Sequence, residues 1–420
     1  MLINELPEDC FVEIFDYIQD LKDLINCFKV CEKWSNLIVA RTKKVKYFID
    51  RPNHSPDSVF QQSDEPIDVA FLSEWFPNLR IFDLSHPFFE KTPKKNNVEL
   101  STDAPFDTID TMDYSTIARL LAYGFDDLVL SPAQEKSPIE KFFSGSESLK
   151  GIICGKYFDF KLMPQKDNLE MLSLGFINPN RIVSNETVKQ LNLWDSTLDS
   201  FKKVAHYFPN LKRLKISSFK DKIDYYSNGP VMKNLKIVEL SGSSRRSPYI
   251  FCNSFVFMDS CPALQSAHIK IERGPILTIY SVKNANLQDL VLQLYAPVKW
   301  KNLPRCVSKY PNLKHLSLRN FSLKDEDIKQ LILILPKLTL LDVRKSFGVS
   351  QKAADLVQDY CKQYGRSIKF YFKKDDKQIE SDWPQILNRP DKICRGFDFM
   401  EHCFFKSFND LPHFLDPIDD

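Results

Sequence analysis

The sequence lacks most features that assign a protein to a membrane, to the secretory pathway or to a nucleic acid. Its 57 basic and 55 acidic residues nearly cancel, so charge gives no reason to expect wholesale binding to nucleic acid or to a membrane surface. The start MLINELPEDCF has no basic region, apolar region or small-residue cleavage site, so it does not resemble a secretory signal. The longest apolar stretches, such as LILIL at 331–335, are far shorter than the roughly 20 residues that a membrane-spanning helix needs.

Metal-binding and catalytic signatures are missing from the sequence as well. The ten cysteines never form a CxxC pair, and the nearest two, Cys27 and Cys31, are one helical turn apart, where thiols usually act as small apolar groups. The seven histidines are scattered, and there is no P-loop, dinucleotide fingerprint, GxSxG elbow or HExxH. We therefore expect no catalytic residue, no cofactor and no metal. We expect a soluble protein with reduced thiols in the cytoplasm, the nucleus or both.

The first 40 residues have the pattern of three short helices. Leu6-Pro7-Glu8-Asp9 is a favourable helix start, because proline at the first helical position loses no needed donor and the carboxylates face the positive end of the helix dipole. Three helices of this length bury little surface, so we expect them to need a partner. The apolar residues at helical spacing are Phe11, Ile14, Phe15 and Ile18, then Leu21, Leu24, Ile25, Cys27 and Phe28 after a capping Asp20, and then Val30, Cys31, Trp34, Leu37 and Ile38.

The segment LPEDCFVEIFDYI followed by DLINCFKVCEKW resembles the F-box, a motif that binds the adaptor Skp1. One departure is visible, because Gln19-Asp20 makes the connection to Leu21 one residue longer than the commonest pattern, which should only lengthen a loop. The alternative is a three-helix segment that packs on its own chain without an outside partner. The resemblance implies that Skp1 contacts are made by Leu6, Pro7, Ile14, Phe15, Ile18, Leu24, Val30, Cys31 and Trp34.

Beyond residue 70 the chain repeats an L-x-x-L-x-L pattern. Alternate leucines of such a pattern face one side of a short strand, and the preceding leucine packs against the next unit. Between 149 and 338 the steps are 20, 19, 23, 24, 29, 23, 26 and 25 residues, most of them within or close to the range of leucine-rich repeats. Helical stretches such as 325–335 and 350–362 should form the convex wall. Clear copies begin at Leu79, Leu169, Leu211, Leu235, Leu287, Leu313 and Leu338, and looser ones at Phe125, Leu149, Val188 and Leu264.

A proline shortly before the strand leucine strengthens this interpretation. Proline cannot continue the incoming helix, so it marks a corner between helix and strand, and it disfavours the alternative of leucine-rich helices with accidental spacing. The chain resembles the leucine-rich-repeat branch of the F-box proteins. The fold class implied is α+β by modules, with an N-terminal three-helix F-box followed by an α/β leucine-rich-repeat solenoid, or horseshoe. The prolines are Pro77, Pro209, Pro262, Pro311 and Pro336.

The repeat pattern fails in two places. Residues 86–116 show no clear copy and contain either an inserted loop or a degenerate early unit. After about residue 374 the period stops, and this acidic-ended part should either cap the open end of the solenoid or fold back on its concave face. We predict an F-box at 1–45, a leucine-rich-repeat solenoid at 46–373 with a possible insertion at 86–116, and a C-terminal cap or tail at 374–420.

The resemblance implies a non-catalytic adaptor: the substrate-recognition subunit of an SCF-type E3 ubiquitin ligase, with Skp1 and through it a cullin as partners. Such an adaptor acts by holding a protein substrate close to the ubiquitin-loaded enzyme. The alternative is a leucine-rich-repeat interaction scaffold outside a ligase. An RNA-binding or enzymatic role has neither a basic cluster nor a catalytic constellation to support it.

The residues between the strand leucines should point away from the core and line the concave face, open to solvent. They lean basic, which favours an acidic or phosphorylated peptide as the substrate segment, because each cation can make a charge-assisted hydrogen bond. A solvated face without a ligand is the alternative. The candidate substrate-binding residues are Arg213, Lys215, Glu239, His268, Lys270, His315, Arg319 and Arg344.

Overall fold

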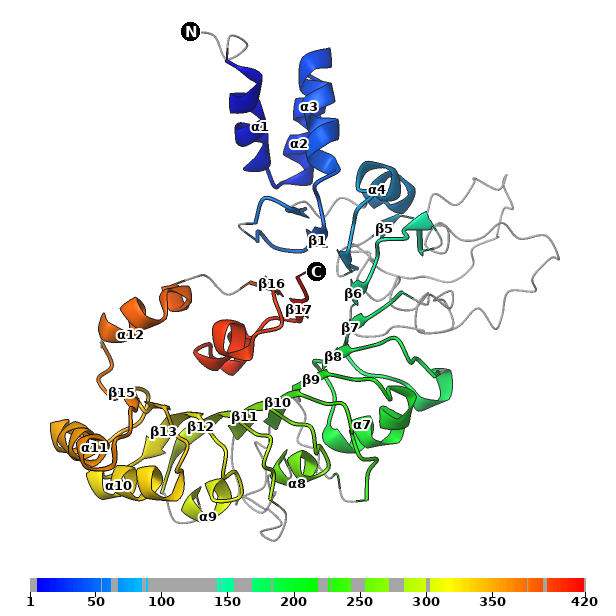
Figure 1. Ribbon diagram of the computed structural model, residues 1–420. Helices are drawn as coiled ribbons and strands as arrows, with labels where there is room; N and C mark the ends of the chain where they lie inside the picture. The colour runs from blue at the N-terminus through cyan, green and yellow to red at the C-terminus, as the bar shows by residue number, and fades with distance from the viewer. Residues whose placement is uncertain are drawn as a thin grey trace, which may run out of the picture. The chain divides into compact units, whose positions relative to one another are not determined.

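The computed structural model describes residues 6–84, 88–89, 142–154 and 168–418, apart from gaps inside these ranges, the longest of which are 62–66, 218–225, 243–253 and 272–282. Among these residues, three helices come first and thirteen parallel strands of one sheet follow (Figure 1). This is the predicted arrangement of a three-helix module and a leucine-rich-repeat solenoid. The insertion predicted at 86–116, except for a two-residue strand, and the repeat copy predicted at Phe125 lie outside the described residues.

The chain divides into two compact units, Met1–Ile182 and Val183–Asp420, and each is described by itself. The division falls within the repeats and not at residue 45 or 373, so the predicted domain limits stay a prediction. In the described part of the chain, no helix has the length and apolar character needed to cross a membrane.

Three helices begin unit 1 because each has a start signal and an apolar face. Pro7 precedes the first helix with a φ of −55°, close to the value that its ring imposes. Asp20 begins the second helix, where its side chain accepts hydrogen bonds from the backbone N–H groups of Lys22 and Asp23. The helices are α1 (Glu8–Asp16), α2 (Leu21–Phe28) and α3 (Glu32–Thr42).

The three helices share a small aromatic core. The rings of Phe11 and Phe15 meet Trp34 edge to face, with centroids 5.7 and 5.2 Å apart. A core of this size leaves the apolar residues on the outer helix faces without cover from these helices.

A buried arginine joins the helices to the strands of unit 1. Arg41 donates hydrogen bonds to the backbone oxygens of Phe15 and Ser58, at 3.3 and 3.4 Å, and its guanidinium lies 3.6 Å from Asp16. Burial lowers the pKa of Arg41, and the Asp16 carboxylate opposes that shift. The cation is therefore held by groups from a helix and from a strand.

Two strands of the thirteen-stranded sheet, β1 and β2, precede the first repeat found in the sequence. β1 pairs with both β2 and β4 in parallel. Val45 and Phe48 are buried and occupy the first two leucine positions of the L-x-x-L-x-L pattern. The other edge of β2 meets the connection between α1 and α2, because the N–H of Phe60 donates to the carbonyl of Gln19 at 2.9 Å. The elements of unit 1 after the helices are β1 (Tyr47–Ile49), β2 (Ser58–Phe60), β3 (Ile67–Asp68), α4 (Val69–Trp75), β4 (Ile81–Asp83), β5 (Phe88–Phe89), β6 (Gly151–Ile153), β7 (Met171–Leu174) and the turn η3 (Pro179–Arg181).

In unit 2 each predicted repeat supplies one strand. Neighbouring strands are parallel and in step, so that Leu290 pairs with Ala267 on one side and with Leu316 on the other, and all three are buried. The looser copies at Val188 and Leu264 also precede strands. The strands are β8 (Gln190–Leu193), β9 (Arg213–Ser217), β10 (Ile237–Gly242), β11 (Ser266–Ile271), β12 (Asp289–Lys299), β13 (His315–Ser322), β14 (Leu340–Asp342) and β15 (Lys369–Tyr371).

The corners before the strands contain a ladder of asparagine side chains that the sequence reasoning missed. The residue directly before the first leucine of a copy is often asparagine, and its side-chain amide donates to a carbonyl of the preceding unit. Asn210 reaches Glu186 at 2.9 Å, and Asn312 reaches Ala285 at 2.7 Å. Corresponding hydrogen bonds are made by Asn78, Asn234 and Asn286. Each of these corners is thereby attached to its neighbour along the chain.

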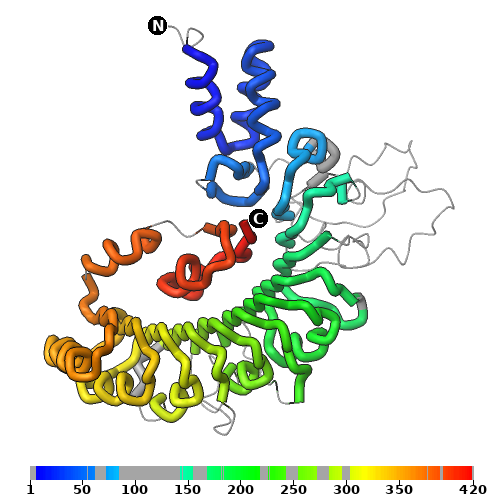
Figure 2. The backbone as a smooth tube through the Cα atoms, viewed as in Figure 1, coloured from blue at the N-terminus to red at the C-terminus, as the bar shows by residue number. Residues whose placement is uncertain are grey.

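Helices and turns cover the convex face of the unit 2 sheet (Figures 1 and 2). α10 and α11 occupy the stretches predicted at 325–335 and 350–362. Ser350 caps α11, and Gly365 ends it with a φ of 62°, a left-handed value that glycine adopts without strain. The elements are α7 (Leu198–Val204), η4 (Ala205–Tyr207), α8 (Ser254–Asp259), α9 (Leu303–Val307), α10 (Asp325–Ile334) and α11 (Gln351–Tyr364).

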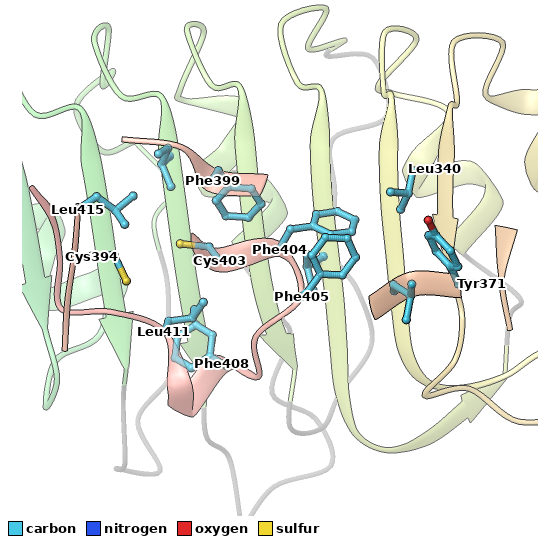
Figure 3. Packing of buried hydrophobic residues seen from close by; sticks show 13 residues of the cluster. Leu340, Tyr371, Cys394, Phe399, Cys403, Phe404, Phe405, Phe408, Leu411 and Leu415 are labelled. Carbon is cyan, nitrogen blue, oxygen red and sulfur yellow. The ribbon is translucent and has the colours of Figure 1, made fainter. Parts of the chain in front are cut away.

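Residues 391–418, which we call the C-terminal segment, fold back over the concave face of unit 2 (Figure 1). This is the second of the two arrangements left open by the sequence. Aromatic and aliphatic side chains of the segment pack with strand residues, including Leu340 and Tyr371, in one buried cluster (Figure 3). The elements after β15 are α12 (Lys377–Asp382), the turn η5 (Pro384–Leu387), β16 (Ile393–Arg395), the π-helical turn η6 (Met400–Phe404), the turn η7 (Phe408–Asp410) and β17 (Phe414–Asp416).

Candidate interaction surfaces

The nine residues that were predicted to contact Skp1 differ in how far the structure buries them. Most of those that a partner can reach lie at the ends of the three helices or in the connections between them. Pro7, Ile14, Val30 and Cys31 are exposed, Leu6, Ile18 and Trp34 are half-buried, and Phe15 and Leu24 are buried.

The exposed members include apolar side chains that the helices themselves leave in water. Ile14 exposes 41% and Val30 57% of its surface, and Tyr17, directly after the helix that contains Ile14, is also exposed. Leaving such side chains in water costs about 25 cal/mol per Å² of apolar area, which a partner surface would recover. Exposed apolar residues on a small module are candidates for a protein interaction site.

Phe15 and Leu24 require a correction of the sequence interpretation. Both lie in the core of the helical module, where Phe15 contacts Trp34, so neither is open to direct contact with a partner in this conformation. Their periodic spacing predicted an apolar face correctly, but it could not distinguish the part of that face that packs inward from the part that stays outside. We infer that Phe15 and Leu24 maintain the shape of the helical module and do not themselves contact a partner.

The concave face of unit 2 is also not open as predicted, because the C-terminal segment covers it. Five of the eight candidate substrate-binding residues are buried, and the other three are half-buried. The buried ones are Arg213, Lys215, Glu239, His268 and Arg319, and the half-buried ones are Lys270, His315 and Arg344.

The cations at the β9 end of this face hold backbone carbonyls of the segment. Arg213 donates to the carbonyl oxygens of Pro412 and His413, at 2.8 and 2.9 Å, and forms a 2.7 Å ion pair with Glu239. Lys215 donates to the carbonyl oxygen of Leu411 at 2.8 Å. The acceptors that the segment offers to these cations are therefore main-chain carbonyls and not the acidic side chains that the sequence interpretation favoured.

Arg319 makes the same kind of contact on β13. It donates to the carbonyls of Phe404 and Lys406, at 2.6 and 2.5 Å, where the turn η6 ends. Carbonyls at the end of a helical turn lack partners within the turn and carry partial negative charge, so a cation there stabilises the turn.

Burial lowers the pKa of Lys215, His268 and Arg319 in this layer. It lowers the pKa of Lys215 to about 8, with Glu239 opposing the shift, and it lowers the pKa of Arg319 to about 10, with Asp342 opposing. His268 interacts electrostatically with both cations, and its ring meets the ring of Phe408 edge to face at a centroid distance of 5.6 Å. Burial, with the nearby Arg319 and Lys215, holds the pKa of His268 well below its usual value, so this imidazole is neutral.

The three half-buried candidates each have a partner on this face. His315 and Asp289 lie 2.6 Å apart, and Arg344 pairs with Asp342 at 2.9 Å. Lys270 donates to the side chain of Asn409 in the segment at 3.4 Å.

Sequence reasoning missed Gln190, whose side chain acts as a strand partner for the segment. Its amide nitrogen donates to the carbonyl oxygen of Leu415 at 2.6 Å, and its amide oxygen accepts from the N–H of the same residue at 3.0 Å. The two residues are 225 positions apart, and no local pattern in the sequence connects them.

Comparison with known proteins gives a match for the helical module. Residues 3–42 match the F-box-like family model. The search of curated proteins found no match. Among solved structures, an internalin (inlF) from Listeria monocytogenes str. 4b F2365 shows 13% identity over 56% of this chain and 76% of that chain, with a TM-score of 0.30. A likeness at that level carries no functional argument, so the repeats are assigned from this chain's own strands and register.

Proposed function

We propose that this chain is the substrate-recognition subunit of an SCF-type E3 ubiquitin ligase, in which α1–α3 bind Skp1 and unit 2 binds the substrate. The observation that carries the proposal is the coincidence of the F-box-like match at 3–42 with exposed apolar residues at Ile14 and Val30. The chain contributes proximity and no catalytic group, because a bound substrate has a high effective concentration near the ubiquitin-loaded enzyme.

The buried and half-buried residues of the concave face have different roles in this proposal. Lys270, His315 and Arg344 are half-buried and stay proposed as direct substrate contacts. The five buried residues act on a substrate through the C-terminal segment, which they hold in place. Exposed side chains of the segment, such as Asp398 and Glu401, then form part of the substrate-facing surface.

Binding of purified Skp1 to the full chain tests the first half of the proposal. Val30→Asp should weaken binding at least tenfold, because it places a charge in an apolar contact. Val231→Asp is a matched control, since Val30 and Val231 are each 57% exposed and only Val30 lies in the helical module. Leu6→Ala with Pro7→Ala should also weaken binding sharply. The assignment would be wrong if neither Val30→Asp nor the double variant of Leu6 and Pro7 changed the affinity for Skp1.

Reconstitution with Skp1, a cullin complex and ubiquitin separates the ligase from an interaction scaffold. A ligase subunit should co-purify with Skp1 and a cullin in equal amounts and should promote ubiquitin transfer to itself or to a captured protein. Skp1 binding without a cullin and without transfer would instead indicate the scaffold function.

A further inference from the structure

The last strand of the solenoid has an edge that the described residues do not pair. β15 pairs with β14 on one side, and in the described part of the chain no strand lies on its other side. The N–H of Lys369 donates to Thr339, and the carbonyl of Tyr371 accepts from Val343, both at 2.8 Å. Because strand backbones alternate, the N–H and C=O of the intervening Phe370 point to the outer edge.

This edge is rich in lysine. Residues 362–377 contain six basic residues and two acidic ones. Lys373 and Lys374, which follow Phe372 after the end of the strand, are exposed, and Lys369 exposes half of its side chain although it pairs with Asp382. Arg366 is engaged elsewhere, since it donates to three carbonyls beside α10. The excess positive charge is therefore concentrated on the lysines around β15.

An apolar contact lies beside these charges. The rings of Phe370 and Phe372 are stacked, with centroids 5.4 Å apart and planes 12° apart, and both residues are half-buried. The ammonium group of Lys373 lies 5.5 Å from the ring centroid of Phe372. A strand added at this edge would meet backbone hydrogen-bonding groups, aromatic surface and positive charge together.

We propose that the outer edge of β15 binds an extended acidic segment of a partner protein by strand addition. Lysines on an edge strand oppose pairing with a second copy of the same edge, because like charges would face each other. The same lysines attract glutamate and aspartate side chains, while the backbone of Phe370 supplies the hydrogen bonds. The candidate residues of the concave face favoured an acidic peptide as ligand, but Arg213, Lys215 and Arg319 are buried there. Exposed cations that an acidic peptide could contact lie instead around β15. The inference concerns unit 2 and does not depend on Skp1 binding.

The probe is a synthetic eight-residue peptide of alternating glutamate and valine, titrated onto the full chain without Skp1 at low salt and again at high salt. Lys373→Glu with Lys374→Glu should lower affinity at least tenfold. Lys329→Glu with Lys337→Glu, which changes the net charge equally at exposed positions on and after α10, should change affinity less than twofold. Phe370→Pro removes the outward N–H donor without removing a hydrogen bond to β14, and it should also abolish binding.

Hydrogen exchange on the wild-type chain provides a measurement that needs no substitution. The peptide should slow exchange of the Phe370 amide and leave the helices of unit 1 unchanged. The proposal is overturned if the peptide does not bind at low salt, if a lysine–valine peptide binds equally well, or if the Phe370 amide is not protected on binding. Charge-dependent binding that survives Phe370→Pro in a folded variant would also overturn it, because strand addition needs that donor.

Discussion

At the scale of single residues, the C-terminal segment changes which strand positions are buried. Leu290 and Leu316 face the leucine core, as the repeat predicts, and both are fully buried. Val291 and Ser317 lie between the leucines and were expected to face solvent, but they are equally buried, and Val291 belongs to the cluster formed with the segment. The expectation of a solvated alternate face was wrong because the second covering layer comes from a distant part of the chain.

This burial predicts the cost of truncating the two kinds of position. Leu316→Ala should lower the free energy of unfolding by about 2–5 kcal/mol through loss of contacts and an internal cavity. Val291→Ala should cost about 1–2 kcal/mol, at roughly 0.8 kcal/mol for each buried carbon removed. Val231→Ala, at an exposed position, should cost less than about 0.5 kcal/mol. Chemical denaturation would measure all three, and equal small losses for Val291→Ala and Val231→Ala would contradict the buried contact.

Arg319 allows a second prediction at this scale. Arg319→Met keeps much of the side-chain volume but removes the donors to the carbonyls of Phe404 and Lys406. A buried acceptor left without a partner costs about 1–3 kcal/mol. Hydrogen exchange in residues 400–406 should therefore accelerate at least fivefold, while exchange in α1–α3 stays unchanged. Arg344→Met, which removes a half-buried pair with Asp342, is the matched control and should have little effect on that turn.

At the scale of elements, docking of the C-terminal segment should weaken in acid. The pKa of His268 is held well below 6.5 by burial first and then by Arg319 and Lys215, although the nearby polar groups of Gln293 and Cys403 oppose the shift. The undocked state exposes this histidine and binds a proton near pH 6.5, whereas the docked state does not. The contribution of His268 to docking therefore does not change with pH above 6.5. Below pH 6.5 it lowers the docking equilibrium constant by up to tenfold per pH unit, until the lowered pKa is reached.

Hydrogen exchange of residues 391–418 at pH 7.5, 6.5 and 5.5, corrected for intrinsic rates, would measure this dependence. His268→Gln should reduce it, because glutamine fills a similar space without titrating. Some dependence should remain, since burial also lowers the pKa of His402 in the segment itself. An exchange profile that does not change between pH 6.5 and 5.5 would show that the segment does not release His268 to solvent.

At the scale of the whole molecule, the C-terminal segment belongs to the core of unit 2 and is not a loose tail. Its aromatic residues include Phe399, Phe404 and Phe408, all buried, and burial of each such side chain is worth about 1.5–3 kcal/mol. Ending the chain after residue 390 should lower the melting temperature and expose apolar surface to a dye such as ANS. A synthetic peptide of residues 391–418 should reverse both changes in part. The Skp1 binding proposed for the helices serves as a control, and an unchanged melting temperature would contradict this role for the segment.

Much of the architecture was predictable because its determinants are local. The helices follow from apolar spacing, Pro7 and the capping Asp20, which act within a few residues of one another. The solenoid follows from the alternating leucines and the corner prolines, because each unit has the same local pattern and packs only against its neighbours. The Leu-Pro start and the apolar spacing of the segment that matches the F-box-like model could likewise be predicted from the sequence.

The sequence by itself therefore determined the helices, the repeat register and the strand faces, whereas the tertiary structure decided which of those faces stay accessible. Phe15 and Val30 look alike as apolar residues at helical spacing, and only packing places one inside and the other outside. On the concave face, Arg213 and Lys215 bind backbone carbonyls, which every residue possesses, so no residue type in the segment indicates the contact. The contact between Gln190 and Leu415 depends on where the chain returns after 225 residues, and that position follows from the curvature of the stacked units and not from any local pattern.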